Sequence, residues 1–437
     1  MKRAKPHKRP APTPRTAQVQ IEKPIYGGSF LARIEGKATF VPLTLPGEEA
    51  RVRIVEDKRN YSTAEPEAVV IAAPNRIAPQ CPHFGACGGC NYQHADYETQ
   101  LKWKEDILRE TLQRGGMHPL ENISILSGDP WHYRNRIRIG FYHAGRVGYR
   151  ARRSHDIISI RECPIAAPLL VRAALALEEI LSSRQSFRPT EISLFCNADE
   201  TQLLASIYVQ SSSTRQEFEK FSAAWQKLIP AIVGIELVEE GRPGFDARQL
   251  ARTGNLSIAY RTGGVDYRVD HGAFFQVNRW LIDRLVSTVI GERHGTLAWD
   301  LFAGVGLFSR RLTERFAEVI AVESSPQAKL ALAANLEGTS GRSVDADILS
   351  FLKTHRQIAR PDLIVVDPPR AGLGADTAAL LADTSAPSIV YVSCDPATLA
   401  RDLNALLKSG YSLASVTLAD LFPQTFHLET VVELQRS

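Results

Sequence analysis

The sequence has no run of about 18 apolar residues, so it offers no segment long enough for a membrane-spanning helix. Its start, Met1-Lys2-Arg3-Ala4-Lys5-Pro6, is basic but no apolar stretch follows, so a secretory signal is not expected. Cysteine and methionine are scarce, with 6 and 2 residues among 437. We therefore expect a cytoplasmic protein that has no membrane partner and no disulfides.

The length and composition indicate a globular protein of several domains. A chain of 437 residues is too long for one ordinary core. Hydrophobic residues make up 44% and charged residues 23%, which is typical of soluble proteins. Nothing in the pattern indicates an obligate protein partner.

The net charge of +4 is unevenly distributed along the chain. Residues 1–15 contain lysines and arginines but no acid, and this proline-rich arm is expected to be disordered. It either contacts phosphate or is a solvated tail. Residues 131–155 also lack acids, and aromatic residues alternate there with arginines, which favours contact with a nucleic acid over a merely solvated hairpin. The arginines are Arg134, Arg136, Arg138, Arg146, Arg150, Arg152 and Arg153.

Periodicity divides the chain into parts with different folds. Residues 16–72 read as short strands with turns at Tyr26-Gly27-Gly28 and Pro46-Gly47-Glu48, which predicts a small β-barrel. Residues 96–114 have helical spacing, and residues 125–270 mix strands and helices. From Leu281 onward strands and helices alternate, which predicts an α/β fold with a doubly wound, mostly parallel sheet. The predicted parts are a basic arm (1–15), a barrel (16–72), a mixed α+β central domain (73–270), whose helix 96–114 can pack on the last part, and a C-terminal domain (271–437).

A glycine-rich turn marks the expected cofactor site. Gly304 and Gly306 follow a predicted strand that ends at Phe302, where backbone can approach a ligand. Glu323 ends the next strand and is placed to accept hydrogen bonds from ribose hydroxyls. The third glycine of a dinucleotide motif is absent, since Ser309 occupies that position, and this favours S-adenosylmethionine. Either Asp347 or its close competitor Asp345 is expected to bind the adenine amino group.

Four of the cysteines have the spacing of a ligand set. Cys81, Cys87 and Cys90 lie in a glycine-rich run, and Cys163, followed by Pro164, is a natural fourth ligand. Four thiolates suit zinc or a [4Fe–4S] cluster. The five-residue gap after Cys81 is longer than in zinc ribbons, which favours the iron–sulfur cluster. Cys196 lies in an apolar strand and is expected to be a buried small residue.

Two short motifs near the C-terminus predict covalent catalysis. Cys394 ends a predicted strand and precedes a helix, whose N-terminus favours the reactive thiolate. Glu429 begins the final predicted strand and is the candidate base, with His427 as a neighbour that positions it. Asp367, in Asp367-Pro368-Pro369-Arg370, can bond the cofactor or a base edge. The alternative interpretations are a buried small residue for Cys394, a sheet-edge carboxylate for Glu429 and a helix cap for Asp395.

This set of groups is what methylation at C5 of a pyrimidine requires. The C5 carbon is a poor nucleophile until a thiolate adds to C6 and generates an enolate. A base must then remove the C5 proton so that the thiol can leave. Because a base inside a helix cannot reach the thiol, the target is expected to be unpaired or flipped.

At these residues the chain resembles the RNA uracil-5-methyltransferases, and specifically the bacterial 23S rRNA enzymes that carry an N-terminal TRAM domain and an iron–sulfur cluster. The resemblance implies a class I methyltransferase fold that uses S-adenosylmethionine, with Cys394 as nucleophile and Glu429 as base. It also implies that Gln276, Phe302, Glu323 and Asp367 line the cofactor site, joined by Asp347. The matching elements are Tyr26-Gly27-Gly28, the four cysteines, residues 274–278, the glycine-rich turn, residues 367–370, residues 393–402 and His427-Leu428-Glu429.

The chain departs from the family pattern at three positions. Ala303 stands where relatives often have cysteine, Leu307 where they have asparagine, and Asp395 where asparagine is more frequent. These changes leave the core chemistry intact. The tRNA members of the family generally lack the barrel and the cluster, so 23S rRNA is the expected partner. The alternatives are a tRNA uracil-C5 methyltransferase and a non-catalytic RNA-binding protein of the same fold.

Overall fold

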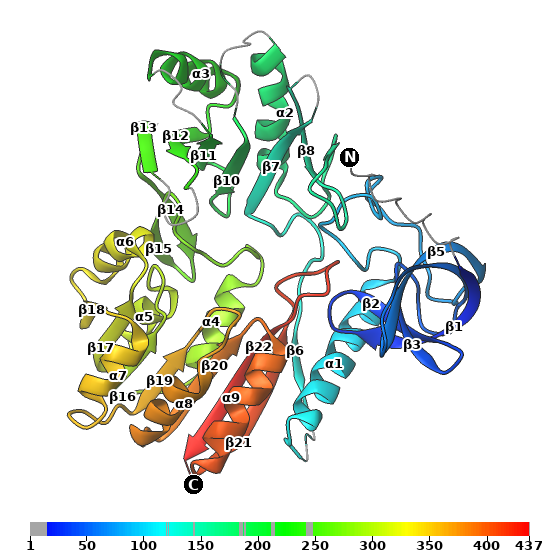
Figure 1. Cartoon of the computed structure of the whole chain (residues 1–437). Coiled ribbons are helices and arrows are strands. Elements are labelled where there is room, and N and C mark those ends of the chain that lie inside the picture. The colour runs from blue at the N-terminus through cyan, green and yellow to red at the C-terminus, as the bar shows by residue number, and fades with distance from the viewer. Residues whose placement is uncertain are drawn as a thin grey trace, which may run out of the picture.

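The computed structural model of the protein describes residues 15–118, 120, 122–142, 145–182, 187, 189–210, 215–241 and 248–436. The basic arm expected at residues 1–15 lies outside this part of the chain except for Arg15, which pairs with Glu35. The chain forms a small barrel, a middle sheet with helices α2 and α3, and a larger sheet flanked by helices (Figure 1). Among the described residues, no helix combines the length and the apolar character that crossing a membrane requires.

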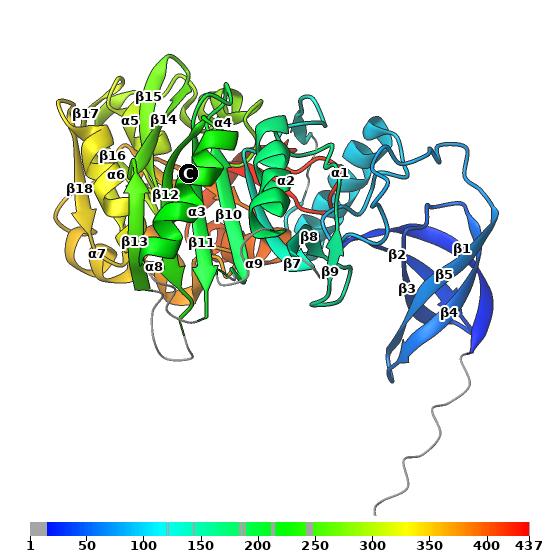
Figure 2. The same cartoon turned by 90° about the horizontal axis from the view of Figure 1, so that it is seen from above.

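The N-terminal strands close into a barrel in the order β1-β2-β3-β5-β4. Their side chains alternate in direction, so Val19, Ile21 and Phe30 point into a common core while charged neighbours face solvent. The barrel lies at one end of the molecule (Figure 2). The small β-barrel expected from the sequence is confirmed. Its strands are β1 (Thr16–Ile25), β2 (Ser29–Ile34), β3 (Lys37–Pro42), β4 (Glu49–Asp57) and β5 (Tyr61–Ile71).

The middle sheet has the order β13-β12-β11-β10-β7-β8-β9, and α2 (Pro168–Ser182) and α3 (Arg215–Leu228) share its core. The arginine-rich stretch supplies β7 and β8, which pair as a hairpin. Tyr133 is fully buried and is therefore unavailable to stack on a base, whereas Tyr142 is exposed. Cys196 is buried in this core, as expected. The strands are β7 (Arg136–Tyr142), β8 (Arg146–Arg150), β9 (Ile157–Ser159), β10 (Glu191–Cys196), β11 (Leu203–Val209), β12 (Ile232–Glu239) and β13 (Arg248–Gly254).

The C-terminal sheet has the order β18-β17-β16-β19-β20-β22-β21-β6, and its strands from β18 to β20 are parallel. The antiparallel hairpin β14 (Ser257–Thr262) and β15 (Val265–Asp270) precedes it. The α/β sheet expected from the alternation of strands and helices is thus confirmed. Its strands are β16 (Gly295–Leu301), β17 (Phe316–Glu323), β18 (Gly341–Asp345), β19 (Leu363–Val366), β20 (Ser388–Ser393), β21 (Tyr411–Ala419), β22 (Glu429–Arg436) and β6 (Ser124–Leu126).

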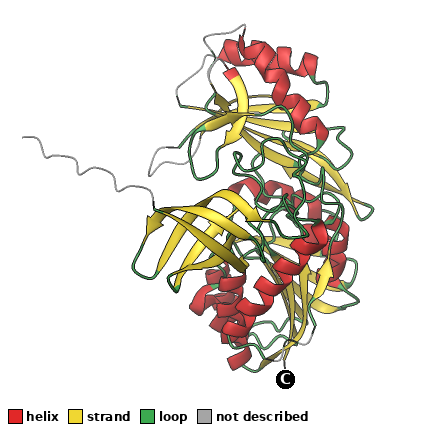
Figure 3. Ribbon diagram, turned by 90° about the vertical axis from the view of Figure 1, so that its right-hand side faces the viewer, coloured by secondary structure: helices red, strands yellow, loops and turns green. Residues whose placement is uncertain are grey.

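Helices cover both faces of this sheet, which explains why its strands are apolar on both sides. One core contains residues from α4, α5 and α6, and the other contains residues from α1, α7, α8 and α9. Figure 3 shows the helices packed around the strands of this unit, below the middle sheet. The helices are α1 (Tyr97–Arg114), α4 (Ile282–Ile290), α5 (Leu307–Leu312), α6 (Pro326–Leu336), α7 (Ile348–His355), α8 (Gly374–Asp383) and α9 (Pro396–Lys408).

The helix α1 and the strand β6, which precede the C-terminal domain in the sequence, pack onto its core and its sheet edge. Ile107, Leu108 and Leu112 of α1 are buried in the same core as Leu399 and Leu403 of α9. The short strand β6 pairs in parallel with β21 at the sheet edge. The sequence indicated that helix 96–114 can pack here, but β6 is too short to be recognised from its pattern.

Candidate active site

Strand register brings Cys394 and Glu429 together. The antiparallel strands β20 and β22 place Ser393 opposite Thr430. Cys394 directly follows the last residue of β20 and Glu429 is the first residue of β22, so both lie at this end of the sheet, close enough for the Glu429 charge to act on the Cys394 thiol. Cys394 is partly buried, and Glu429 is 4% exposed. The fold therefore makes neighbours of the nucleophile and the base expected from the sequence.

Cys394 is a thiol rather than a thiolate before substrate binds. Burial, together with the carboxylates of Glu429 and Asp367, raises its pKa to about 11, while Arg370 opposes this shift. The adjacent helix end does not compensate, because Asp395 caps α9 and accepts hydrogen bonds from its first free amides. The expectation that the helix N-terminus favours the thiolate is therefore wrong for the resting protein.

The buried carboxyl groups near Cys394 have raised pKa values. Burial and then Asp367 raise the pKa of Glu429 well above its usual range. Burial and then Asp300 raise the pKa of Asp367 to about 7. Buried carboxyl groups with raised pKa values are suited to proton transfer.

The loop that carries Asp367 is shaped by two residues of α9. Asp402 accepts hydrogen bonds from the backbone nitrogen of Leu373 at 2.7 Å and from the Tyr391 hydroxyl at 2.8 Å. Arg401 also bonds the Asp402 carboxylate, at 2.8 Å. A Cβ atom on Gly372 would lie 2.4 Å from Asp402 Oδ2, so the loop needs a glycine there. The end of the motif that follows Cys394 thus shapes the Asp367 loop.

The glycine-rich turn follows β16 and contacts Glu323 directly. The amide of Gly304 donates a hydrogen bond of 2.8 Å to Glu323 Oε2. The other carboxylate oxygen accepts from the amides of Ser324 at 2.8 Å and Ser325 at 2.6 Å. Phe302, at the start of the turn, has a φ of 65°, an unusual conformation for a residue with a side chain. The turn and Glu323 are therefore fixed relative to each other.

Ser309, which replaces the third glycine of a dinucleotide motif, has a partner. Its hydroxyl donates to Oδ2 of Asp300, which is 0% exposed. Burial raises the pKa of Asp300 to about 7, and the bond from Ser309 opposes that shift. Gly306 has a φ of 88°, and a Cβ atom there would lie 2.8 Å from Leu332 Cδ1. This position accordingly requires glycine on two grounds.

Gln276 approaches the same site from the chain that follows β15. Its Nε2 atom lies 3.5 Å from Oδ2 of Asp367. Its backbone oxygen accepts a hydrogen bond of 2.9 Å from the side chain of Asn135, which precedes β7. The structure thus brings Gln276 to Asp367, as the family resemblance implies.

The two aspartates considered for the adenine lie in different settings. Asp345 ends β18 opposite Glu323 and forms an ion pair with Lys329. Asp347 caps α7 and accepts a hydrogen bond of 2.9 Å from the amide of Ser350. Both stand near the carboxyl edge of the sheet where Glu323 lies, so both remain candidates.

Two residues at the site, Tyr26 and Arg370, make contacts that sequence reasoning did not assign to them. The Tyr26 hydroxyl reaches the carbonyl oxygen of Cys394 at 3.4 Å, and Arg370 contacts His427 Nδ1 at 3.3 Å. Burial, with Arg370 next, lowers the pKa of His427 to about 4, so this histidine is neutral at neutral pH. The motifs containing these residues were noticed, but only the fold shows that their side chains converge.

The four clustered cysteines line one cavity of about 730 Å³ beside the arginine-rich strands. Burial raises the pKa of all four thiols, to about 11 for Cys87 and about 12 for Cys90. Among the described residues, no three His, Cys, Asp or Glu side chains form a group that could hold a metal ion. Two features of the cavity suit a bound metal cluster. All four cysteines line it, and so does Arg134, whose buried Nε atom has no hydrogen-bond partner among the described residues.

Comparison with known proteins identifies the class to which the chain belongs. Residues 14–66 match the TRAM domain model, and residues 356–437 match the model of tRNA (Uracil-5-)-methyltransferase. Among solved structures, the chain is similar to the Pyrococcus abyssi tRNA (uracil-54, C5)-methyltransferase in complex with S-adenosyl-L-homocysteine. The TM-score is 0.76 at 23% identity, over 96% of this chain and 100% of that one. The chain therefore has the fold of a class I methyltransferase.

Curated relatives extend this result over nearly the whole chain. An uncharacterized RNA methyltransferase of Thermotoga maritima is 31% identical over 95% of this chain and 98% of its own length. The 23S rRNA (uracil(1939)-C(5))-methyltransferase RlmD of Shewanella woodyi is 31% identical over 96% of each chain. The protein belongs to the RNA uracil-5-methyltransferase family and is an enzyme of that class.

Proposed function

We propose that the protein transfers a methyl group from S-adenosylmethionine to C5 of a uridine in 23S rRNA. The observation that carries this proposal is the register of β20 and β22, whose last pair, Ser393 and Thr430, supports a placement of Cys394 close to Glu429. Asp367 lies close enough to raise the pKa values of both groups. This arrangement supplies the nucleophile and the base that uracil C5 chemistry needs.

In the proposed reaction Cys394 forms a covalent bond to C6 of the uracil. The electron pair of the C5–C6 double bond moves toward O4, and the resulting enolate makes C5 nucleophilic. When bound, S-adenosylmethionine would supply an electrophilic methyl group to C5, the S–CH3 bond breaking as the C5–CH3 bond forms and S-adenosylhomocysteine leaves. Because the Cys394 thiol is protonated in the resting protein, its proton passes to water as the uridine binds and the sulfur adds to C6.

Glu429 completes the reaction as the general base. It removes the proton from C5, the electron pair re-forms the C5–C6 double bond, and the sulfur of Cys394 leaves C6. Since Glu429 is buried, its position relative to the ring is fixed by the chain on either side. The target uridine must be unpaired or flipped to reach this depth.

We propose that the cofactor binds along the carboxyl edge of the parallel strands. Backbone at the glycine-rich turn approaches the ligand, and Glu323 accepts from the ribose hydroxyls. An aspartate beyond β18 binds the adenine amino group. The proposed cofactor residues are Gln276, Phe302, Gly304, Gly306, Glu323, Asp347 and Asp367, with Asp345 as the alternative to Asp347.

We propose that Cys81, Cys87, Cys90 and Cys163 are ligands of a [4Fe–4S] cluster. Four thiols on one cavity are the donor set that such a cluster uses, and Arg134 offers a cation beside it. The cluster would join the glycine-rich loop to Cys163 and so stabilise this region. Anaerobic purification followed by metal analysis tests the assignment, and stoichiometric zinc without iron would contradict it.

The identity of the RNA rests on the relatives. The RlmD enzymes are named for uracil 1939 of 23S rRNA, whereas the similar solved structure is named for uracil 54 of tRNA. The higher identity to RlmD favours 23S rRNA, and tRNA is the second candidate. Labelled methyl transfer to separate 23S, 16S and tRNA pools distinguishes them. Formation of 5-methyluridine in 23S RNA alone is expected, and label in tRNA alone would contradict the substrate assignment.

We also propose that the chain divides as its sequence indicates, into a barrel (16–72), a central RNA-binding domain (73–270) and a methyltransferase domain (271–437). The helix α1 and strand β6 then belong structurally to the last of these.

A further inference from the structure

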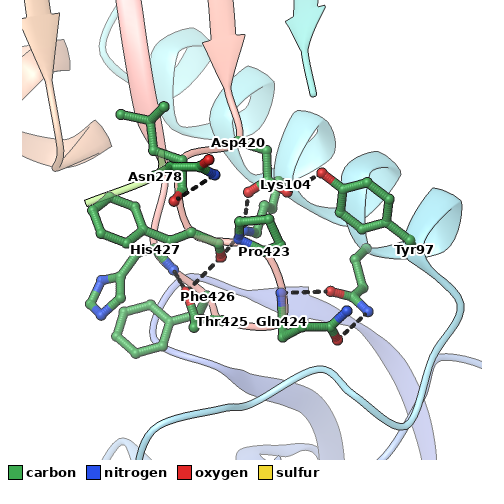
Figure 4. Close-up of polar contacts among 12 residues, drawn as sticks. Tyr97, Lys104, Asn278, Asp420, Pro423, Gln424, Thr425, Phe426 and His427 are labelled. Atoms are coloured by element: carbon green, nitrogen blue, oxygen red, sulfur yellow. Dashed lines mark hydrogen bonds and ion pairs between the residues drawn. The ribbon is translucent and has the colours of Figure 1, made fainter. Parts of the chain in front are cut away.

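The segment from Asp420 to Leu428 connects β21 to β22 and leads directly into Glu429. Figure 4 shows polar contacts of this segment with Tyr97, Lys104 and Asn278. It contains neither helix nor strand, yet Asp420, Leu421 and Gln424 are each at most 2% exposed. Gln424 also has a φ of 67°. A buried irregular segment must find hydrogen-bond partners outside itself, because no regular structure supplies them.

Those partners come from other parts of the chain. Each carbonyl oxygen from Leu421 to Gln424 accepts a hydrogen bond from a donor outside the segment. The donors are Asn278 Nδ2 to Leu421 (3.2 Å), Lys104 Nζ to Phe422 (2.9 Å), Tyr133 Oη to Pro423 (3.0 Å), and the amides of Asn91 (2.9 Å) and Tyr92 (3.1 Å) to Gln424. The path of the segment is therefore determined by the regions that surround it.

A buried ion pair fixes the beginning of the segment. Lys104 Nζ lies 2.6 Å from Asp420 Oδ1, and both side chains are fully buried. The Tyr97 hydroxyl donates to the other oxygen of Asp420 at 2.8 Å. Burial lowers the pKa of Lys104, and Asp420 opposes that shift. Because Lys104 bonds both this carboxylate and the Phe422 carbonyl, it ties two points of the segment to α1.

Different parts of the chain hold Glu429 and Cys394 in place. Cys394 lies between β20 and α9, both of which are held by their own regular hydrogen bonds. Glu429 is the first residue of its strand, where it pairs with Ala419 of β21, so this pairing and the irregular segment before it together set its position. A misplacement of roughly 1 Å in a reacting group can slow a step by about 100-fold.

We propose that Lys104 and Tyr133 are positioning residues that hold Glu429 in place for the removal of the C5 proton. This inference rests on the proposed function and names residues outside the C-terminal part of the sequence that serve it. Neither side chain needs to contact the uridine. Loss of either donor leaves the addition of Cys394 and the methyl transfer intact and slows the elimination step.

The test measures the covalent enzyme–RNA adduct, which a merely structural role would not increase. The variants are Lys104→Met and Tyr133→Phe, and Tyr411→Phe is the matched control. The Tyr411 hydroxyl also donates to a buried carbonyl, that of Ala386 at 2.9 Å, but at the opposite end of β21 from the segment. Each variant is incubated with S-adenosylmethionine and unmodified 23S RNA, and the adduct is quantified on a denaturing gel beside the single-turnover methyl transfer.

We expect both variants to accumulate adduct and to turn over roughly 10-fold more slowly, with an unchanged rate of methyl transfer. Tyr411→Phe should match the wild type. Equal losses of methyl transfer and elimination, or an unchanged adduct level in Tyr133→Phe, would overturn the positioning role. Tyr133→Phe keeps the buried ring and removes only the hydroxyl. If Lys104→Met unfolds, Tyr133→Phe alone therefore tests the positioning role.

Glu429→Gln separates this inference from the proposed function. If Glu429→Gln traps adduct but the two variants do not, only the positioning role fails. If the wild type forms no 5-methyluridine and Glu429→Gln forms no adduct, the proposed reaction itself fails.

Discussion

The hydroxyl of Tyr26 lies 3.4 Å from the carbonyl oxygen of Cys394, so a turn of the N-terminal barrel touches the residue proposed as nucleophile. The ring of Tyr26 also meets Phe426 edge-on, with centroids 5.6 Å apart. Phe426 belongs to the segment that leads into Glu429. The barrel therefore forms part of the wall of the active site.

This contact predicts a graded effect of substitution at Tyr26. Tyr26→Phe removes one long hydrogen bond, and we expect kcat to fall about 2-fold to 3-fold. Tyr26→Ala also removes the contact with Phe426, and a loss of about 10-fold is expected. Steady-state methyl transfer measures both. Tyr61→Phe, elsewhere on the barrel, is the control, and a Tyr26→Ala rate equal to that control would contradict the role.

The proposed mechanism predicts different outcomes at the two catalytic positions. Cys394→Ala should abolish methyl transfer and leave RNA binding intact, since only the nucleophile is lost. Glu429→Gln should form the methylated adduct and fail to release it, because no base removes the C5 proton. Nucleoside analysis and denaturing gels check these results. Unchanged transfer by Cys394→Ala would remove the covalent mechanism.

The protonation of Cys394 predicts slow alkylation at neutral pH. Burial, then Glu429 and Asp367, raises the pKa of this thiol to about 11, so only a small fraction is thiolate at pH 7. The rate of reaction with iodoacetamide should rise about tenfold per pH unit up to that pKa. Glu429→Gln removes the negative charge that Glu429 carries once it ionises, which lowers the pKa of Cys394 and moves the profile to lower pH. Subtraction of the Cys394→Ala rate isolates this thiol, and a plateau near pH 8 would be inconsistent with the burial argument.

Two glycines with similar backbone conformations allow a matched test of the glycine-rich turn. Gly306 has a φ of 88° and no room for a Cβ atom, whereas Gly410 has a φ of 90° and open space around it. Alanine at either position should cost about 1 kcal/mol or more in the free energy of unfolding because of the left-handed backbone. Only Gly306→Ala should weaken S-adenosylmethionine binding, by roughly 10-fold or more, as measured by calorimetry. Equal binding by both variants would contradict the placement of the cofactor.

The sequence predicted the parts of the fold that local patterns determine. The alternation expected from Leu281 onward includes the helix Pro326–Leu336 and the strand Leu363–Val366, because a proline start and a short apolar run are local signals. The proximity of Cys394 to Glu429 was expected from family resemblance, and strand register supplies its physical cause.

Features that join distant residues could not be predicted in this way. The Lys104–Asp420 pair spans 316 positions of sequence, and no local pattern distinguishes this lysine from a solvated one. The lack of a local pattern for distant contacts also explains why Cys394 was wrongly predicted to favour the thiolate. The helix start next to it is visible in the sequence, whereas the opposing carboxylates come from other strands.

The strand β6 has a consequence for how the protein is made. Residues 124–126 leave the ribosome early, but their parallel partner β21 follows only near the end of the chain. The residues of β6 therefore stay unpaired while the intervening residues emerge. Loops of that length close slowly. A protein that begins at residue 271 would lack this strand and α1, so it would expose an apolar face and is expected to aggregate rather than fold.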